Sequence, residues 1–275
     1  MEITDIIKEA MIFPSGGISQ LAIYIVLSIV GVILALFGIG FIGIGLVDNV
    51  VWAVLGIILL IAGLALVFVI LGYQVSIIKS GIDRSEDVPE FDWMANLVTG
   101  IKYLVLNIVY FIIPAIIVLI VAWAMNLFGM AAEMFTKMAN ASMAAGGSTV
   151  AFAEVVPQSL IISFGTALMV TGLVAFVLFL IFAFIKVMGE SRLANTDSLG
   201  DGLNIPEAFK DMGKIGYVKV ILVVVIIFVI IAVINAILNG LNYYINGISI
   251  LSIIITPYLT FFAARATGLL YSEIA

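Results

Sequence analysis

Side chains able to do enzymatic or metal chemistry are scarce in this chain. Its 275 residues include no cysteine and no histidine. These absences exclude disulfides, thiolate and imidazole metal sites, and catalytic dyads or triads that depend on either side chain. The remaining Asp, Ser, Tyr and Lys residues form no convergent cluster in the linear sequence. We therefore expect no catalytic residue, no cofactor and no metal, and a protein that is not an enzyme.

A glycine pattern near the start of the chain resembles a nucleotide site. Gly38-Ile39-Gly40-Phe41-Ile42-Gly43 spells the dinucleotide fingerprint, but it lies inside an apolar stretch with no strand before it. Small residues in such stretches instead favour close packing of helices in lipid. We expect this packing to involve Gly31, Ala35, Gly38 and Gly45 in one helix and Ala53, Gly56 and Gly63 in the next.

Methionines recur at four-residue spacing in a connection that spans residues 129–158. Met130, Met134 and Met138 would share one helix face, with Phe135 beside them, before Ala144-Ala145-Gly146-Gly147-Ser148 ends the helix. A methionine stripe can bind Cu(I). More often it is a flexible hydrophobic face that lies on a membrane or on a helix bundle, which is our preferred interpretation.

The composition is that of a membrane protein. Hydrophobic residues make up 64% of the chain and charged residues 10%, too few to cover the surface of a water-soluble domain. The net charge is -6 and the basic residues form no dense run, which excludes a nucleic-acid footprint and a polybasic lipid-binding patch. The acidic start, Met1 to Ala10, lacks the basic character of a secretory signal, so we expect the first helix to be retained.

Six apolar stretches have the length of about 20 residues that a bilayer crossing needs. We expect all six to be helices, because a lone strand in lipid would leave its backbone unpaired. The fold class is therefore all-α transmembrane. The stretches are Ile18 to Val47, Val50 to Ile78, Ile101 to Phe128, Leu160 to Met188, Gly216 to Leu238 and Ile248 to Tyr271.

The basic residues predict the orientation of these helices. Ten of the eleven Lys and Arg residues fall on the side of the two termini, and Lys137 is the exception. Cytoplasmic connections are enriched in Lys and Arg. We therefore expect a multi-pass protein of the cell membrane with both termini in the cytoplasm.

An internal repeat appears when the chain is shifted along itself. Asp87-Val88-Pro89-Glu90 then matches Asn204-Ile205-Pro206-Glu207 without a gap. Asp or Asn can cap a helix, proline is favoured in its first turn, and the following Glu can reach back. Asp87, Pro89 and Glu90, and likewise Asn204, Pro206 and Glu207, are thus expected to start amphipathic helices that lie in the cytoplasmic interface as elbows.

The elbows divide the expected single membrane domain, 1–275, into three units. Met1 to Phe13 is a third candidate elbow, separated from the first span by Pro14. Each unit would hold one elbow and one helical hairpin. They cover residues 1–78, residues 87–188 with the outer excursion 129–158, and residues 204–271.

Two stretches resemble a known family. They are Ile6-Ile7-Lys8-Glu9-Ala10-Met11-Ile12-Phe13-Pro14-Ser15 and the segment that runs from Gly72-Tyr73 through Val88-Pro89-Glu90-Phe91-Asp92 to Gly100 and Lys102. Nearly the whole chain resembles a family of archaeal membrane proteins, frequent in methanogens and catalogued as a domain of unknown function. The second elbow is looser, with Ala208 at the position of Phe91. The resemblance implies a multi-helix membrane domain and no particular ligand.

A few polar and aromatic residues are candidates for contacts with lipids or a partner. Lys186 and Arg265 lie near cytoplasmic helix ends, where we expect them to snorkel to the interface, a lipid headgroup or carboxylate being the alternative. Trp93 and Phe209 are expected at headgroup depth. The acids Asp87, Glu90, Glu207 and Asp211 could form a cation or partner site, although capping already explains one acid in each tetrad.

Three functions remain open. The absence of catalytic groups and of charge at mid-membrane favours a non-enzymatic scaffold or accessory subunit, with membrane lipids and a membrane-protein partner or a second copy as partners. The repeat, with Pro114 and Pro257 inside two spans, leaves a transporter or lipid-handling protein for an apolar or amphipathic substrate as the alternative. An intramembrane enzyme is third, because it would require a cluster that the sequence does not show.

Overall fold

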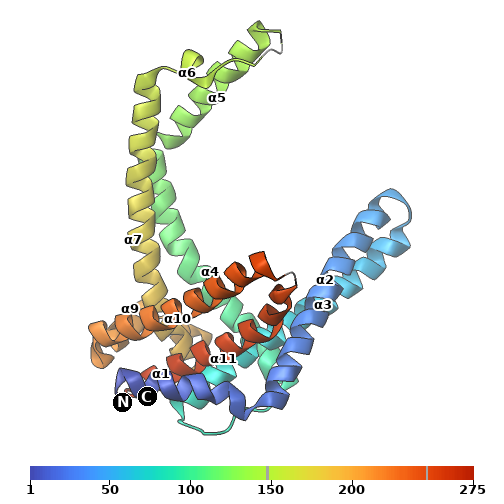
Figure 1. The fold of residues 1–275 in the computed structure, drawn as a ribbon, viewed down its shortest axis with the longest axis vertical. Coiled ribbons are helices and arrows are strands. Elements are labelled where there is room, and N and C mark those ends of the chain that lie inside the picture. Colours follow the sequence, from blue (N-terminus) through green and yellow to red (C-terminus); the bar gives the residue numbers. More distant parts are fainter. Residues whose placement is uncertain (147–148, 246) are drawn as a thin grey trace. The chain divides into compact units, whose positions relative to one another are not determined.

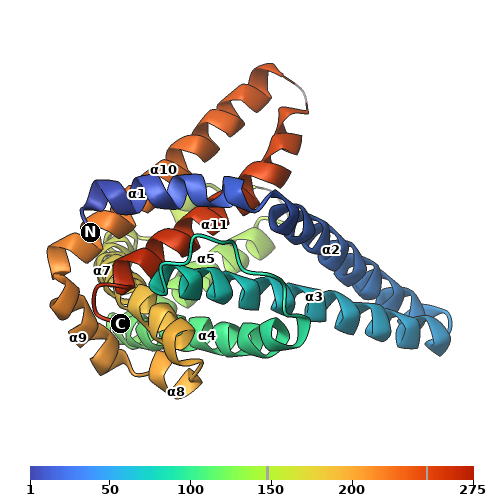
Figure 2. The ribbon, with the colours of Figure 1, turned by 90° about the horizontal axis from the view of Figure 1, so that it is seen from below.

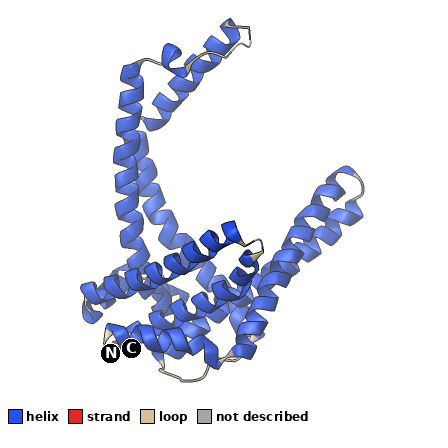
Figure 3. Ribbon diagram, viewed as in Figure 1, coloured by secondary structure: helices blue, strands red, loops and turns tan. Residues whose placement is uncertain are grey.

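The fold is a set of helices joined by short connections. The computed structural model describes residues 1–146, 149–245 and 247–275, and among these it contains no strand (Figure 3). The elements are α1 (Ile3–Ile12), η1 (Phe13–Gly16), α2 (Ile18–Val47), α3 (Val50–Ile82), α4 (Trp93–Ala124), α5 (Leu127–Ala144), α6 (Phe152–Val155), α7 (Gln158–Thr196), α8 (Leu199–Gly202), α9 (Ile205–Ile215), α10 (Tyr217–Tyr244), η2 (Ile248–Leu251) and α11 (Ser252–Tyr271).

Six of these helices are long and apolar enough to cross a membrane. They are α2, α3, α4, α7, α10 and α11, which confirms the expected number of spans among the described residues. The bounds of α2 match the expected range. The largest differences are in α4, which begins at Trp93 instead of Ile101 and ends at Ala124 instead of Phe128, and in α7, which continues beyond Met188 to Thr196 and so contains residues expected in a connection.

The chain divides into two compact units. The first comprises Met1–Ile108 and Phe184–Ala275, and the second comprises Val109–Ala183. In the second unit, the rings of Phe111 and Phe179 lie 6.1 Å apart, and α5 ends at Ala144 as expected. Gly147 and Ser148, the end of the expected helix break, lie outside the described residues. The candidate site described below belongs to the first unit.

Helices α2 and α3 pack closely along their length (Figure 1). A Cβ atom added to Gly38 would lie 2.8 Å from the Gly56 carbonyl oxygen, and one added to Gly63 would lie 2.8 Å from the Gly31 carbonyl oxygen. Neither position can hold a larger side chain without separating the backbones. This confirms that the small residues of the two helices serve packing, and it excludes the dinucleotide interpretation of Gly38 to Gly43.

Helix α11 is the most enclosed of the six. In its most apolar window 61% of residues are buried, against at most 22% in the other five helices. It packs against α3 and α1, and Figure 2 shows α1 lying beside it. Phe261 of α11 forms an edge contact with Tyr24 of α2, at 5.2 Å between ring centroids, and lies 5.6 Å from Tyr73 of α3. This aromatic cluster joins three helices in the core.

Two of the three expected elbows are separate helices. Helix α1 lies within Met1 to Phe13, and Pro14 follows it in η1. Helix α9 begins after Asn204, whose side chain accepts a hydrogen bond from the Glu207 amide at 3.3 Å, as a cap does. The Glu207 carboxylate does not complete a capping box, because it pairs with Lys210 at 2.6 Å.

The expected start of the middle elbow is wrong. Residues 87–90 are not helical, and α4 begins at Trp93 and runs without a break through Gly100 into the span. The Pro89 carbonyl accepts a 2.6 Å hydrogen bond from Tyr73, and Phe91 stacks on the Tyr73 ring at 3.8 Å. These tertiary contacts compete with helix formation in the segment, and Asp87, Pro89 and Glu90 do not start a helix. Asp92 takes the capping role instead, accepting from the Ala95 amide at 3.0 Å.

Candidate functional site

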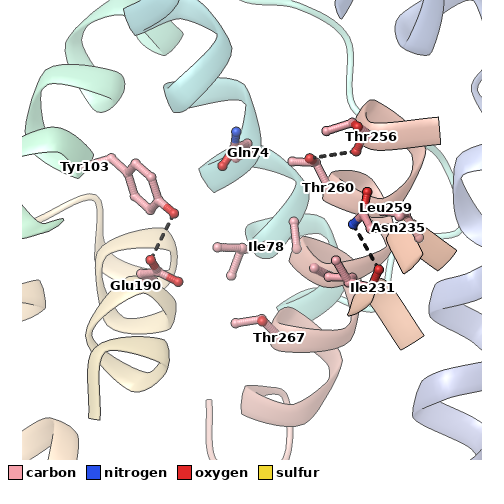
Figure 4. A pocket seen from close by; sticks show the side chains of 12 residues that line it. Gln74, Ile78, Tyr103, Glu190, Ile231, Asn235, Thr256, Leu259, Thr260 and Thr267 are labelled. Atoms are coloured by element: carbon pink, nitrogen blue, oxygen red, sulfur yellow. Dashed lines mark hydrogen bonds between the residues drawn. The ribbon is translucent and has the colours of Figure 1, made fainter. Parts of the chain in front are cut away.

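A polar cavity of about 280 Å³ lies among the helices of the first unit. Helices α3, α4, α7, α10 and α11 all contribute to it. Figure 4 shows Tyr103 and Glu190 on one side and Asn235, Thr256 and Thr260 on the other. Because its walls come from helices that are long and apolar enough to span a membrane, the polar side chains in the cavity are unusual and mark it as the candidate site. Its lining residues are Gln74, Ile78, Tyr103, Glu190, Ile231, Asn235, Thr256, Leu259, Thr260, Ala263, Ala264 and Thr267.

The close approach of α3 and α11 positions two walls of this cavity. A Cβ atom added to Gly81 would lie 2.9 Å from the Cα atom of Gly268, and one added to Gly268 would overlap the Ile78 carbonyl. Only glycine permits this contact. It places Gln74 and Ile78 of α3 opposite the threonines of α11.

Glu190 is the charged group of the cavity. Its residue is 8% exposed, and its Oε1 atom accepts a hydrogen bond of 2.9 Å from the Tyr103 hydroxyl and lies 3.0 Å from Lys186 Nζ. Lys186 also donates to the Asn107 side chain at 2.6 Å. A buried carboxylate requires such a partner, because taking an unpaired charge out of water is costly. The four side chains thus form one polar network beside the cavity.

The opposite side of the cavity is held by hydrogen bonds from side-chain amides and hydroxyls. Gln74 Nε2 donates to the Tyr24 hydroxyl at 2.8 Å, and Asn235 Nδ2 donates to the Ile231 carbonyl at 2.9 Å. Thr260 donates to the Thr256 carbonyl at 2.9 Å. These bonds fix the amides in one orientation, which leaves their carbonyl oxygens available to a bound molecule.

An apolar groove adjoins the polar cavity. It has a volume of about 430 Å³ and lies between α2 and α11, with Ile25, Ile29 and Val32 on one wall and Ile253 and Pro257 on the other. Thr256 and Thr260 line both the groove and the cavity. Tyr24, which holds Gln74, lines the groove as well. The two spaces are therefore adjacent, and one is polar while the other is apolar.

Arg265 does not snorkel. It is 1% exposed, and its Nη2 atom lies 2.6 Å from the Glu9 carboxylate of α1. Its Nη1 atom donates to the Ser80 carbonyl at 2.8 Å, and its guanidinium lies 4.4 Å from the centre of the Phe13 ring. The snorkelling interpretation is wrong because a carboxylate from α1 reaches the buried guanidinium. Arg265 joins α1, α3 and α11 and does not line the polar cavity.

The other candidate contact residues have different surroundings. Lys186 is in the Glu190 network and is only partly exposed, so it too has a protein partner in place of a headgroup. Trp93 is 52% exposed at the start of α4. Its expected depth in the membrane stays a prediction, as does that of Phe209.

Asp211 cannot serve as an open cation site. Its side chain is 1% exposed and accepts from Arg192 at 2.7 Å, Lys214 at 2.7 Å and Tyr271 at 3.1 Å. Burial raises the pKa of the Asp211 carboxyl, but the hydrogen bonds from Lys214, Arg192 and Tyr271 outweigh it and hold that pKa below its ordinary value. The residue fixes α9 to α7 and α11, so the hypothesis of an acidic site fails for Asp211.

The residues that line the cavity were not among the candidate site residues expected from the sequence. Glu190 was assigned to the connection after Met188, because the apolar run ends there, whereas α7 continues through it. The spacing of Lys186 and Glu190, one helical turn apart, was the available signal for this continuation. No local pattern could have placed Gln74 and Asn235 together, because α3 and α10 line the same cavity only in the folded chain.

Comparisons with known proteins identify a family and no function. The family model described as "Protein of unknown function (DUF4013)" matches residues 55–240, which include Gln74, Tyr103, Glu190 and Asn235. No curated protein and no solved structure matches the chain. The function must therefore be argued from the cavity itself.

Proposed function

Because the chain belongs to the DUF4013 family, whose description names no activity, we propose a function from the cavity: the protein binds an amphipathic molecule within the membrane. The polar group of this molecule occupies the cavity around Glu190, and its apolar chain occupies the groove between α2 and α11. Binding leads to transport or presentation of the molecule without covalent chemistry. Of the two main expectations from sequence, this is the transporter or lipid-handling one.

The observation that carries the proposal is the shared wall of the two spaces. Thr256 and Thr260 line both of them, so the two spaces adjoin there. We propose that a single molecule extends from one into the other. An apolar chain leaves the bilayer for an apolar groove at little cost, since both surroundings are hydrocarbon-like. A polar group in the bilayer core has no hydrogen-bond partner, which favours its placement in the cavity.

The size of each space agrees with this division. Ligand sites are commonly about 300–1,000 Å³. The polar cavity alone, at about 280 Å³, suits a small headgroup, and the adjoining groove of about 430 Å³ adds room for part of a chain. A scaffold has no need of a polar cavity inside its spans. The scaffold or accessory role, and a partner or second copy bound to it, stay predictions.

The proposal includes the membrane setting expected from sequence. We place the protein in the cell membrane with both termini in the cytoplasm and with three units of elbow and hairpin, the middle elbow being the start of α4. Six helices of sufficient length and apolar character support the membrane location. The basic residues of the connections support the orientation. The archaeal origin implied by the family resemblance stays a prediction.

Native mass spectrometry of the full chain, purified from membranes in mild detergent, tests the proposal. The wild type should retain an amphiphile of defined mass. Ala263→Phe, which fills the cavity, and Ile29→Trp, which fills the groove, should each lose it. Val47→Trp is the matched control, because Val47 is 91% exposed at the end of α2. A wild type without a bound amphiphile, or equal retention by all variants, would contradict the proposal.

A further inference from the structure

The charge of the cavity narrows the class of polar group that it can hold. Among the described residues that line it, Glu190 is the only charged one, and Lys186 is not part of the lining. Lys186 balances the charge of Glu190 at 3.0 Å from outside the lining, so an anionic group would face the carboxylate and leave the site with a net negative charge. Since like charges at close range in a low-dielectric site are costly, phosphate and carboxylate headgroups are disfavoured.

The cavity offers a bound molecule both hydrogen-bond acceptors and hydrogen-bond donors. Glu190 Oε1 is used by Tyr103 and Lys186, while its second carboxylate oxygen points into the cavity (Figure 4). Gln74 and Asn235 each use one N–H group within the protein, and their carbonyl oxygens make no hydrogen bond with a described residue. A bound group must bring donors to satisfy these acceptors, and a group that also accepts can pair with the remaining N–H of Gln74 and Asn235.

The ion pair between Lys186 and Glu190 favours a hydroxyl over an ammonium group as the donor in the cavity. Hydroxyls and ammonium groups can both donate to Glu190, but Lys186 already balances the Glu190 charge at 3.0 Å. A bound ammonium would leave the site with a net positive charge, whereas a hydroxyl would leave it neutral. Burial of an unbalanced charge costs more than burial of a hydrogen-bonded hydroxyl.

We infer that the polar group is uncharged and carries hydroxyls, as a sugar or glycerol headgroup does, and that Glu190 determines this specificity. One oxygen of Glu190 is held in place by Tyr103 and Lys186, and the other accepts a hydrogen bond from a ligand hydroxyl. Thr267, whose hydroxyl points toward the same space in Figure 4, can supply a second contact. The inference rests on the proposed function and names the substrate class of the same site.

A competition experiment tests the inference. The full chain is placed in nanodiscs that contain equal amounts of three lipids with the same chains: a hexosyl diacylglycerol, a phosphatidic acid and a cationic amine lipid. Native mass spectrometry then measures which lipid stays bound. We expect about a tenfold preference for the hexosyl lipid over each of the others.

Two variants test whether the cavity causes the preference for the hexosyl lipid. Glu190→Gln keeps the shape of the side chain and should reduce the preference about tenfold. Thr267→Val removes one hydroxyl without changing charge and should reduce it about threefold, which keeps the test valid if Glu190→Gln does not fold. Glu133→Gln is the matched control, since Glu133 lies in α5 and pairs only with Lys137 there at 3.6 Å. It should keep the wild-type preference.

The outcomes separate the two claims. A preference for the amine lipid or the phosphatidic acid would overturn the neutral class while supporting binding of an amphiphile. Equal retention of all three lipids, or an unchanged preference in Glu190→Gln and Thr267→Val, would overturn the specificity role of Glu190 and leave the proposed function intact. Retention of none of the lipids by the wild type would contradict both claims.

Discussion

The guanidinium of Arg265 lies 2.6 Å from the carboxylate of Glu9, a residue 256 positions away in the sequence. The contact ties α1 to α11, the most enclosed helix of the first unit. Arg265 is buried, whereas the Glu9 side chain is 42% exposed, so water weakens the attraction from one side only. The pair therefore contributes to stability, but less than a fully buried ion pair would.

Glu9→Gln should lower the free energy of unfolding by about 1–2 kcal/mol, because it leaves a buried guanidinium without its carboxylate. Chemical unfolding in detergent, followed by circular dichroism, measures this change. Glu2→Gln is the matched control just before the same helix, because Glu2 is exposed and its side chain does not cap α1. An equal effect of the two substitutions would show that the Arg265 contact adds nothing.

The cap of α4 gives a second prediction. Asp92→Ala should destabilise the protein by about 1 kcal/mol, because the Ala95 amide loses its acceptor. Asp87→Ala should change stability by less than about 0.5 kcal/mol, since Asp87 caps no helix. Thermal unfolding of both variants would distinguish them. A larger loss of stability in Asp87→Ala than in Asp92→Ala would support the helix start at Asp87 that the sequence predicts.

The contrast between these two aspartates shows what the sequence could predict. The bilayer requires long apolar runs, so the number of spans followed from composition, and the bounds of α2 matched. The tetrad Asp87 to Glu90 carries the signals of a helix start, yet it is not helical, and Tyr73 of α3 donates a hydrogen bond to its Pro89 carbonyl. Asn204 carries similar signals and does cap α9. Local sequence signals indicate possible helix starts, and tertiary contacts determine which of them form.

The cavity could not be predicted from the sequence either, because it too depends on tertiary contacts. Apolar runs locate helices, but they say nothing about which helix faces meet. Glu190 looked like a connection residue, and Arg265 looked like a residue near a helix end. Each acquires its role from a side chain on another helix: Tyr103 for Glu190, and Glu9 for Arg265.

The glycine contact behind the cavity gives a third prediction. Gly268→Ala should destabilise the protein by about 1–3 kcal/mol, because the new Cβ atom overlaps the Ile78 carbonyl and forces α3 and α11 apart. It should also weaken retention of the bound amphiphile. Gly240→Ala is the matched control in α10, where a Cβ atom meets nothing within 4 Å. That substitution should be neutral or stabilising by up to about 1 kcal/mol. Equal stability of both variants would show that the α3 and α11 contact tolerates a side chain.

The buried Asp211 cluster gives a prediction about pH. The pKa of Asp211 in the folded state is below its ordinary value, so the unfolded chain binds the proton more readily. The stability that Asp211 contributes is thus present above about pH 4 and is lost as the pH falls through the lowered pKa. Melting temperatures between pH 7 and pH 2 should drop at the acidic end, and less steeply in Asp211→Asn than in the wild type. Asp48→Asn, at the exposed turn between α2 and α3, should keep the wild-type slope. A wild-type slope in Asp211→Asn would contradict the assignment.

The absence of native cysteines makes the expected orientation directly testable. Single cysteines can be placed without background at Glu2 and Lys210, expected in the cytoplasm, and at Asp48 and Ala145, expected outside. All four residues are exposed in the structure. Since Lys and Arg favour the cytoplasmic side, a membrane-impermeant maleimide should label Asp48→Cys and Ala145→Cys in intact cells. It should label Glu2→Cys and Lys210→Cys only after lysis. Labelling of Glu2→Cys in intact cells would show that the orientation is the reverse of the expected one. The network of Lys186 and Glu190 would then lie near the outer face.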